Sequence, residues 1–323
     1  WPEAKIQSGI GLLDDPYHQR QIPLMLDWEK NGHVLIYGAP QTGKTTLLKT
    51  LLVSLALTRK PDDISIYIMD FGGWNLNLFR AMPHVGGVAN DQDPERLQKL
   101  TLLLRDMLSE RKAAFAHAGV GNIRAYREVT RQDIPDVLLV VDHISAALKL
   151  YPELDGFFSD YTSSGANYGL YLAATAAAAN AVPMKIAQNI KYILALQMID
   201  KSDYTYLVGK APSQLPAVMG RGYAKGTPPL EFQTALPVDG SDQEVSSYIE
   251  RLAQQMSAAW NGRRPAPIPI LPEVIPYGSV SCDGLCLGLS TERVTPVGYD
   301  WKKQHYLLIS GMEQSGKSNL LQV

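Results

Sequence analysis

Two glycine-rich segments of this chain have the residue types and the spacing of phosphate-binding loops. The first consists of Gly38, Ala39, Pro40, Gln41, Thr42, Gly43, Lys44 and Thr45, and Thr46 follows it directly. The second consists of Gly311, Met312, Glu313, Gln314, Ser315, Gly316, Lys317 and Ser318. In such a loop, successive backbone N–H groups and a helix N-terminus surround anionic phosphates. A nucleotide is therefore the first ligand that the sequence predicts.

Two side chains at the end of the first loop have separate roles in binding a nucleotide. Lys44 supplies a positive charge for the β- and γ-phosphates, and the Thr45 hydroxyl is suited to hold Mg²⁺. Apolar runs at Val34–Tyr37 and at residues 306–309 predict a buried strand before each loop. A strand before the loop and a helix after it separate a phosphate-binding loop from an accidental glycine-lysine match. We therefore expect ATP and Mg²⁺ as ligands.

A carboxylate is the second chemical requirement, and Asp142 supplies it. The apolar run at residues 137–141 predicts a strand that ends at Asp142, where P-loop enzymes orient Mg²⁺ and its waters. The alternative is that Asp142 only caps the next helix. The residue that follows is His143, at the position where hydrolytic relatives commonly have a glutamate that polarises water. Imidazole lacks the charge of a carboxylate, so the sequence favours binding without efficient turnover.

Three further positions are candidates, and two of them have a structural alternative. Thr175 follows an apolar run and is suited to sense the γ-phosphate, but Ala176 to Ala179 provide no cation beside it. Whether that alanine run is natural or engineered stays open. Arg221, between two glycines, is either a trans-acting arginine in a ring or a surface arginine in a turn. Asp70, before Phe71-Gly72-Gly73, either lines the nucleotide site or belongs to a tight turn.

The rest of the first module must fold so that these candidate residues lie at one edge of a sheet. Apolar runs at residues 64–69, 170–174 and 192–196 predict further strands, and Asp93-Pro94 predicts a helix start. That helix has an apolar stripe of Leu97, Leu100, Leu103, Leu104 and Met107, which we expect in the core. The alternation predicts an α/β fold, a mostly parallel sheet with helices on both faces. Ligands bind beyond the carboxyl ends of such strands, where the first loop and Asp142 would both lie.

The chain contains a large repeat. Asp27-Trp28 precedes the first loop by the same number of residues as Asp300-Trp301 precedes the second, and Ile10-Gly11-Leu12 has a counterpart in Leu287-Gly288-Leu289. A proline-dense stretch between the copies favours an extended spacer. We predict a P-loop module over residues 1–260, a linker over residues 261–276, and the truncated start of a second module over residues 277–323.

Composition narrows the function classes. The net charge of −2 and the pI near 6.3 argue against a surface built to hold duplex DNA. No apolar run is long enough to span a bilayer and no signal-peptide pattern opens the chain, so we expect this fragment to be soluble. Cys282 and Cys286 have no histidine nearby that would complete a zinc site, and we interpret them as reduced thiols without an assigned function.

Several motifs together resemble the FtsK/SpoIIIE-type ATPases, whose fold is RecA-like. These are the first loop, Asp70-Phe71-Gly72-Gly73, the segment from Pro83 to Val88, and Gly220-Arg221-Gly222-Tyr223. More narrowly, residues 1–262 are similar to a C-terminal module of the EssC/EccC ATPases of Gram-positive type VII secretion. The resemblance resumes from about Val274. Phe71-Gly72-Gly73 in combination with residues 83–88 is its specific part.

The resemblance implies a membrane-anchored coupling ATPase at the cytoplasmic face of the cell membrane, attached through N-terminal segments outside this chain. It implies helical-hairpin substrates of the WXG type, with other modules of the same chain and other secretion components as further partners. The resemblance also implies that the C-terminal modules act as docking platforms with nucleotide bound. Two hypotheses follow: a docking and assembly module with weak or absent hydrolysis, or an active ring ATPase that translocates protein or DNA.

Overall fold

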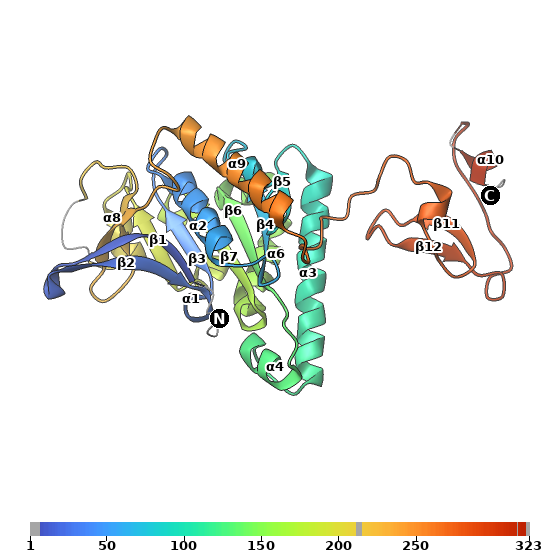
Figure 1. Ribbon diagram of the computed structural model, residues 1–323, viewed down its shortest axis with the longest axis horizontal. Coiled ribbons are helices and arrows are strands. Elements are labelled where there is room, and N and C mark those ends of the chain that lie inside the picture. Colours follow the sequence, from blue (N-terminus) through green and yellow to red (C-terminus); the bar gives the residue numbers. More distant parts are fainter. Residues whose placement is uncertain (1–6, 211–214, 315, 321–323) are drawn as a thin grey trace. The chain divides into compact units, whose positions relative to one another are not determined.

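The computed structural model describes residues 7–210, 215–314 and 316–320, and the chain divides into two compact units. The first unit comprises residues 1–268 and the second comprises residues 269–323. Each unit is described by itself below (Figure 1). Among the described residues, no helix combines the length and the apolar character that crossing a membrane requires.

One sheet runs through the first unit, with ten strands among the residues that the structure describes. Its order is β2-β1-β10-β9-β8-β3-β7-β6-β4-β5. The strands from β8 to β5 are parallel, which confirms the mostly parallel sheet. The bounds are β1 Gln7–Asp15, β2 Arg20–Asp27, β3 Val34–Tyr37, β4 Ile64–Asp70, β5 Val85–Asn90, β6 Asp136–Asp142, β7 Leu170–Ala176, β8 Tyr192–Leu196, β9 Arg221–Ala224 and β10 Leu230–Thr234.

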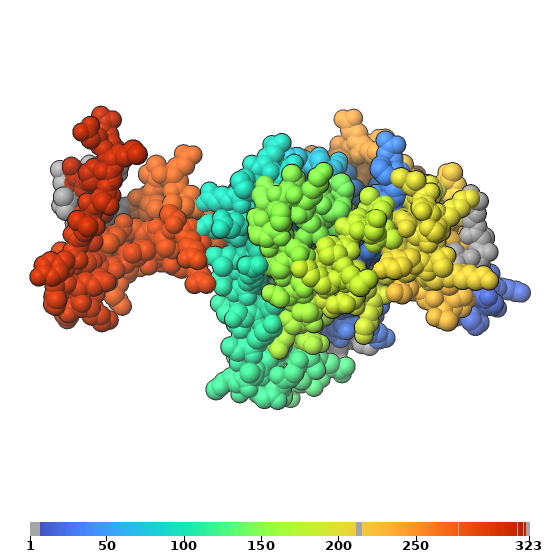
Figure 2. All heavy atoms as spheres, turned by 180° about the vertical axis from the view of Figure 1, so that it is seen from behind, coloured from blue at the N-terminus to red at the C-terminus, as the bar shows by residue number. Residues whose placement is uncertain are grey.

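Helices cover both faces of this sheet, as predicted. Helices α2 (Lys44–Thr58) and α9 (Asp242–Ala259) share one hydrophobic cluster with inward side chains such as Leu138 and Val140. Seen from the opposite side in Figure 2, residues of α3 (Pro94–His117), α5 (Ile144–Leu150) and α6 (Leu154–Ser164) form the surface in teal and green. The shorter helices are α1 Trp28–Asn31, α4 Ile123–Thr130, α7 Met184–Ala187 and α8 Ser202–Leu207.

The predicted strands and the predicted helix start lie where the apolar patterns put them. All seven residues of β6 are buried, because a parallel strand covered on both faces needs apolar side chains on both. Asp93 caps α3 by accepting from the backbone N–H of Arg96, and Pro94 opens the helix. Leu97, Leu100 and Leu104 are buried, whereas Leu103 and Met107 are only partly buried, so the expected core stripe is narrower than predicted.

The antiparallel half of the sheet was not predicted. Strand β8 pairs with β9, β9 with β10, β10 with β1, and β1 with β2, all antiparallel. These strands come from both ends of the module, so no local sequence pattern predicts their pairing. They place the turn before β9 beside the first phosphate-binding loop.

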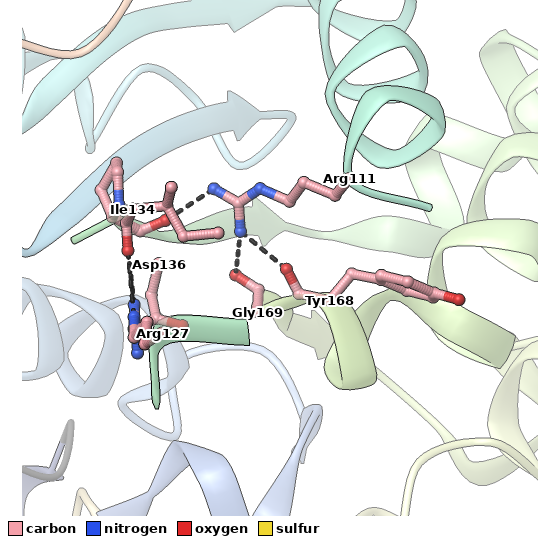
Figure 3. A network of polar contacts seen from close by, with 7 residues as sticks. Arg111, Arg127, Ile134, Asp136, Tyr168 and Gly169 are labelled. Atoms are coloured by element: carbon pink, nitrogen blue, oxygen red, sulfur yellow. Dashed lines mark hydrogen bonds and ion pairs between the residues drawn. The ribbon is translucent and has the colours of Figure 1, made fainter. Parts of the chain in front are cut away.

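At the amino-terminal edge of the sheet, two guanidinium groups lie at the start of β6 (Figure 3). Arg127 donates to Asp136 Oδ2 at 2.7 Å and to the carbonyl of Ile134 at 2.6 Å. Arg111 donates to the carbonyls of Pro135 and Tyr168, at 2.6 and 2.7 Å. Burial raises the pKa of Asp136 to about 6, against the opposing effect of Arg127 and then Arg111. This network joins α3 and α4 to the start of β6.

The second unit begins with a hairpin that repeats the one in the first. Strands β11 (Leu285–Leu289) and β12 (Pro296–Tyr299) are antiparallel, and their register shifts between Cys286 and Gly288. The β1–β2 pair shifts between Gly9 and Gly11 in the same way. Helix α10 (Lys317–Leu320) follows.

The strand predicted at residues 306–309 is wrong. These residues form no strand in the second unit, and Tyr306 and Leu308 are 93% and 91% exposed. Its equivalent in the first unit, β3, lies between β7 and β8 and hydrogen-bonds to both. Among the described residues no strand pairs with this segment, and a parallel strand forms only where neighbouring strands supply its hydrogen bonds.

Candidate nucleotide-binding site

The first phosphate-binding loop connects β3 to α2 at the carboxyl edge of the sheet. Gln41 and Gly43 have positive φ angles of 63° and 100°, and Gly43 directly precedes the helix. Lys44 Nζ donates to the carbonyls of Gly38 and Ala39, each at 2.7 Å. Burial lowers the pKa of Lys44, and the charge of Asp142 opposes this effect. The loop therefore holds a partly desolvated cation and a free helix N-terminus, the two features that favour phosphate.

Neighbouring strands fix the start of this loop. The N–H of Gly38 donates to the carbonyl of Ala176 at 3.1 Å, and that of Ala39 donates to Gln197 at 2.7 Å. Thr42 Oγ1 closes the loop by donating to Ala39. A Cβ on Gly38 would lie 2.6 Å from that hydroxyl, so glycine is required by close approach. Ala176, the first residue of the alanine run, thus contributes a backbone carbonyl.

Asp142 lies at the end of β6, where it meets the hydroxyls that the sequence analysis selected. Thr45 Oγ1 donates to Asp142 Oδ2 at 2.8 Å, and Thr175 Oγ1 donates to Asp142 Oδ1 at 2.5 Å. Asp142 is 2% exposed and Thr175 is fully buried. Because these oxygen atoms converge beside the loop and Mg²⁺ prefers hard oxygen ligands, the residues present fit this cation.

His143 has a backbone role in this structure. Its φ of 65° is left-handed, a conformation in which histidine, asparagine and aspartate are enriched. It occupies the position before α5, and its backbone N–H donates to Thr175 Oγ1 at 2.7 Å. His143 therefore turns the chain and helps to hold the Thr175 hydroxyl on Asp142.

Asp70 lies beside Asp142 on the neighbouring strand and is 1% exposed. Its carboxylate accepts from the N–H groups of Gly72 and Leu76, at 2.9 and 2.8 Å. Burial raises the pKa of Asp70, although these backbone N–H groups oppose the shift. Asp70 thereby shapes the Phe71-Gly72-Gly73 turn.

Gly72 has a role that the sequence alone did not reveal. A Cβ at this position would lie 2.3 Å from Asp142 Oδ2, the oxygen that accepts from Thr45. The turn must therefore pass this close to the carboxylate, and only glycine permits it. A glycine that follows a strand-ending aspartate is a weak signal by itself, because turns explain it equally well.

Arg221 is paired within its own chain. Its Nη1 forms an ion pair with Glu231 Oε1 at 2.7 Å, and its Nε donates to Gln233 Oε1 at 2.9 Å. Both partners lie on β10, next to Arg221 on β9. This geometry supports the interpretation of Arg221 as a structural surface arginine. Arg221 is the first residue of β9, however, and does not lie in a turn.

The residues just before Arg221 contact the loop and were missed by the sequence analysis. The N–H of Gly220 donates to the carbonyl of Thr42 at 2.9 Å. A Cβ on Gly43 would lie 3.3 Å from Met219 Cγ, so Met219 packs against the loop while remaining 62% exposed. Leu236, just after β10, is 51% exposed, and the carbonyl of Ala235 accepts from Thr50 of α2. The apolar side chain of Met219 thus lies beside the start of α2.

The second loop repeats the conformation of the first in its described residues. Lys317 Nζ donates to the carbonyls of Gly311 and Met312, at 2.8 and 2.5 Å. Gln314 and Gly316 have φ angles of 61° and 87°, close to those of Gln41 and Gly43. Ser318 lies in the first turn of α10, and Ser315 lies outside the described residues. The local sequence therefore suffices for this loop conformation, even without flanking strands.

Comparison with known proteins assigns this chain to a family. A sequence profile of the FtsK/SpoIIIE family matches residues 5–227. The chain belongs to this family. It is a P-loop NTPase module of the FtsK/SpoIIIE type, and nucleotide binding follows from that membership.

Curated relatives narrow the comparison to type VII secretion ATPases. The chain is 29% identical to the ESX secretion system protein EccC of Thermomonospora curvata, over 99% of this chain and 25% of that protein. It is 27% identical to the type VII secretion system protein EssC of Staphylococcus aureus, over 84% of this chain and 18% of that protein. The chain thus spans a quarter or less of the length of these relatives.

Solved structures give the same result. EssC (ATPases 2 and 3) from Geobacillus thermodenitrificans superposes with a TM-score of 0.90 at 25% identity, over 99% of this chain and 63% of that one. EccC (ATPases 2 and 3) from Thermomonospora curvata, solved in complex with a signal sequence peptide, gives 0.81 at 29% identity, over 99% and 60%. The similarity extends across both units of the chain.

Proposed function

We propose that the first unit is an ATP- and Mg²⁺-binding module of a type VII secretion coupling ATPase that acts in substrate docking and assembly, with weak or absent hydrolysis. The observation that carries the proposal is the arrangement around Asp142. Two hydroxyls hold the carboxylate, and the next residue is a left-handed histidine instead of a glutamate. Nucleotide can be held there without a carboxylate that polarises water.

Phosphate binding would replace contacts that Lys44 makes within its own loop. Lys44 is bonded to two loop carbonyls, and phosphate oxygens would replace these as stronger, charge-assisted acceptors. Thr45 and Asp142 would hold Mg²⁺, which supplies charge neutralisation at the β- and γ-phosphates. Met219, an exposed apolar side chain beside Gly43, is suited to one face of the nucleobase.

The proposed partners are secretion substrates. The Thermomonospora EccC structure contains a signal sequence peptide, and this chain resembles it along 99% of its length. We therefore infer helical-hairpin substrates of the WXG type, with other modules of the same protein and other secretion components as neighbours. Attachment to the cytoplasmic face of the membrane would come through segments outside these residues. The net charge of −2 argues against duplex DNA as the cargo.

The second candidate is an active ring ATPase that translocates protein or DNA. The complete loop and its contact with Asp142 favour it, because both belong to working P-loop motors. The two candidates differ in turnover. A docking module releases phosphate slowly, whereas an active ATPase turns over at roughly 1–100 s⁻¹.

One set of measurements tests both parts of the proposal. Lys44→Ala should weaken ATP binding at least about tenfold by calorimetry, because it removes a charge-assisted contact. Lys191→Ala, at an exposed position before β8, is the matched control and should bind normally. Unchanged ATP affinity in folded Lys44→Ala protein would reject the site. Phosphate release in the range of ordinary phosphoryl-transfer enzymes would reject weak hydrolysis and favour the ring ATPase.

Partner binding is tested separately. A C-terminal peptide of a cognate WXG-type substrate should bind with modest salt sensitivity, and duplex DNA should bind weakly without sequence preference. Tight DNA binding at physiological salt, together with no binding of any substrate tail, would favour a DNA translocase.

A further inference from the structure

The turn that leads into the second hairpin brings two thiols together. Cys286 lies in β11 opposite Gly298 of β12, and Cys282 precedes the turn at Asp283-Gly284. Cys282 Sγ donates to the carbonyl of Val297 at 3.8 Å, and Val297 directly precedes Gly298, the partner of Cys286. Both thiols are free and partly exposed. They are the two cysteines of the whole chain.

Gly298 makes room for this arrangement. A Cβ on Gly298 would lie 3.2 Å from Cys282 Sγ and 2.6 Å from the carbonyl oxygen of Asp283. The Cβ atoms of residues paired across antiparallel strands are about 4.5–5.5 Å apart. The Cys282 thiol therefore occupies the space that a side chain at residue 298 would take, and residue 298 is the cross-strand partner of Cys286.

The backbone conformation supports the same close approach. Gly284 has a φ of 88°, which reverses the chain between the two cysteines. In the equivalent β1–β2 hairpin, the register shift places Gly9 at the position of Cys286. The dithiol is thus a feature of the second hairpin and not of the repeated fold.

We propose that Cys282 and Cys286 form a reversible intramolecular disulfide that closes this turn. The oxidant is a low-molecular-weight disulfide such as oxidised glutathione. Two protein thiols are oxidised to one disulfide, one glutathione disulfide is reduced to two glutathione thiols, and the number of protons is unchanged overall. The contact is remote in sequence from the Lys44 site, so the proposal is independent of the function proposed for the first unit.

The order of the two exchange steps follows from a difference between the two thiols. The neighbouring Cys286 side chain raises the pKa of the Cys282 thiol to about 11, so Cys282 remains protonated and is the poorer nucleophile. The Cys286 thiolate attacks one sulfur of the oxidant and releases a glutathione thiolate. Cys282 then loses its proton and attacks Cys286 Sγ in the mixed disulfide, which releases the second glutathione. The product fixes residue 282 against β11.

Equilibration of the whole chain in mixtures of oxidised and reduced glutathione tests this proposal. After the remaining thiols are alkylated, mass spectrometry should find a species lighter by two hydrogen atoms, with a linkage between Cys282 and Cys286. Cys282→Ser and Cys286→Ser should each form only mixed disulfides with glutathione. Mixed disulfides or disulfide-linked dimers alone in the unsubstituted protein would overturn the proposal.

A comparison with the unfolded chain tests whether the hairpin is responsible. The equilibrium constant for disulfide formation should be at least about tenfold larger in folded protein than in guanidinium-unfolded protein. Gly298→Ala should reduce it by displacing the Cys282 thiol. Gly278→Ala is the matched control, since a Cβ there has no atom within 4 Å among the described residues. Equal constants in folded and unfolded protein would show that the hairpin does not preorganise the thiols, contrary to the proposal.

Discussion

The two ends of β6 use the same residue type in opposite ways. Asp136 at the start forms an ion pair with Arg127, and the charge of Arg111 also stabilises it (Figure 3). Asp142 at the end is held by the hydroxyls of Thr45 and Thr175, without an ion pair among the described contacts. A carboxylate already neutralised by guanidinium groups is structural. One held by neutral donors keeps its charge available for a cation.

The largest expected difference is between two identical substitutions. Asp136→Asn should lower the free energy of unfolding by roughly 3–5 kcal/mol, because it leaves Arg127 and Arg111 without their counter-charge. Asp142→Asn should lower stability less, because the hydroxyls that hold Asp142 are neutral and an amide oxygen can still accept from them. Denaturant unfolding measures both effects.

Ligand binding should show the reverse order. Mg²⁺-dependent ATP affinity should fall in Asp142→Asn and stay unchanged in folded Asp136→Asn. Equal losses of stability in the two variants would contradict the distinction between the two ends of β6.

The second expected effect concerns the space around Asp142. Gly72→Ala should destabilise the protein by about 1–3 kcal/mol, because its Cβ would displace the carboxylate from Thr45. Magnesium-dependent nucleotide binding should weaken with it. Gly156→Ala, in α6 with no atom within 4 Å of its Cβ among the described residues, should be neutral or stabilising. Normal Mg²⁺-ATP binding by Gly72→Ala would argue against the role of this contact.

The third prediction concerns the pH dependence of stability, which we attribute to His33 at the amino-terminal edge of the sheet. His33, before β3, accepts from the N–H of Leu172 at 3.0 Å, and burial lowers its pKa to about 4. Between pH 6.5 and 4 the unfolded chain binds a proton that the folded chain excludes, so stability falls as the pH is lowered. The loss should reach about 2 kcal/mol between pH 7 and pH 5. Calorimetric unfolding of His33→Asn, which keeps an acceptor but does not titrate, should show this loss removed; parallel pH profiles would refute the assignment.

The smallest expected effect is at Arg221. Because its ion pair with Glu231 is partly exposed, Arg221→Ala should change stability by less than about 1 kcal/mol. Single-turnover phosphate release should also stay the same. A large loss of hydrolysis in Arg221→Ala, with restoration in mixed oligomers that contain unsubstituted protein, would instead identify a trans-acting arginine.

The sequence by itself determined the local elements of the site. The conformation of both loops depends on glycine positions and on a lysine that bonds to its own loop carbonyls. The buried parallel strands were predictable because they are apolar on both faces, and the start of α3 was predictable because Asp93 and Pro94 act within one turn.

Only the tertiary structure decided which residues meet. Thr175 and Asp142 share a hydrogen bond across neighbouring strands, Gly220 bonds to Thr42, and Arg221 pairs with Glu231. These contacts join segments whose spacing in the sequence carries no signal, because strand order is set by packing of the whole sheet. The failed strand at residues 306–309 has the same cause: an apolar run becomes a parallel strand only when neighbouring strands supply its hydrogen bonds.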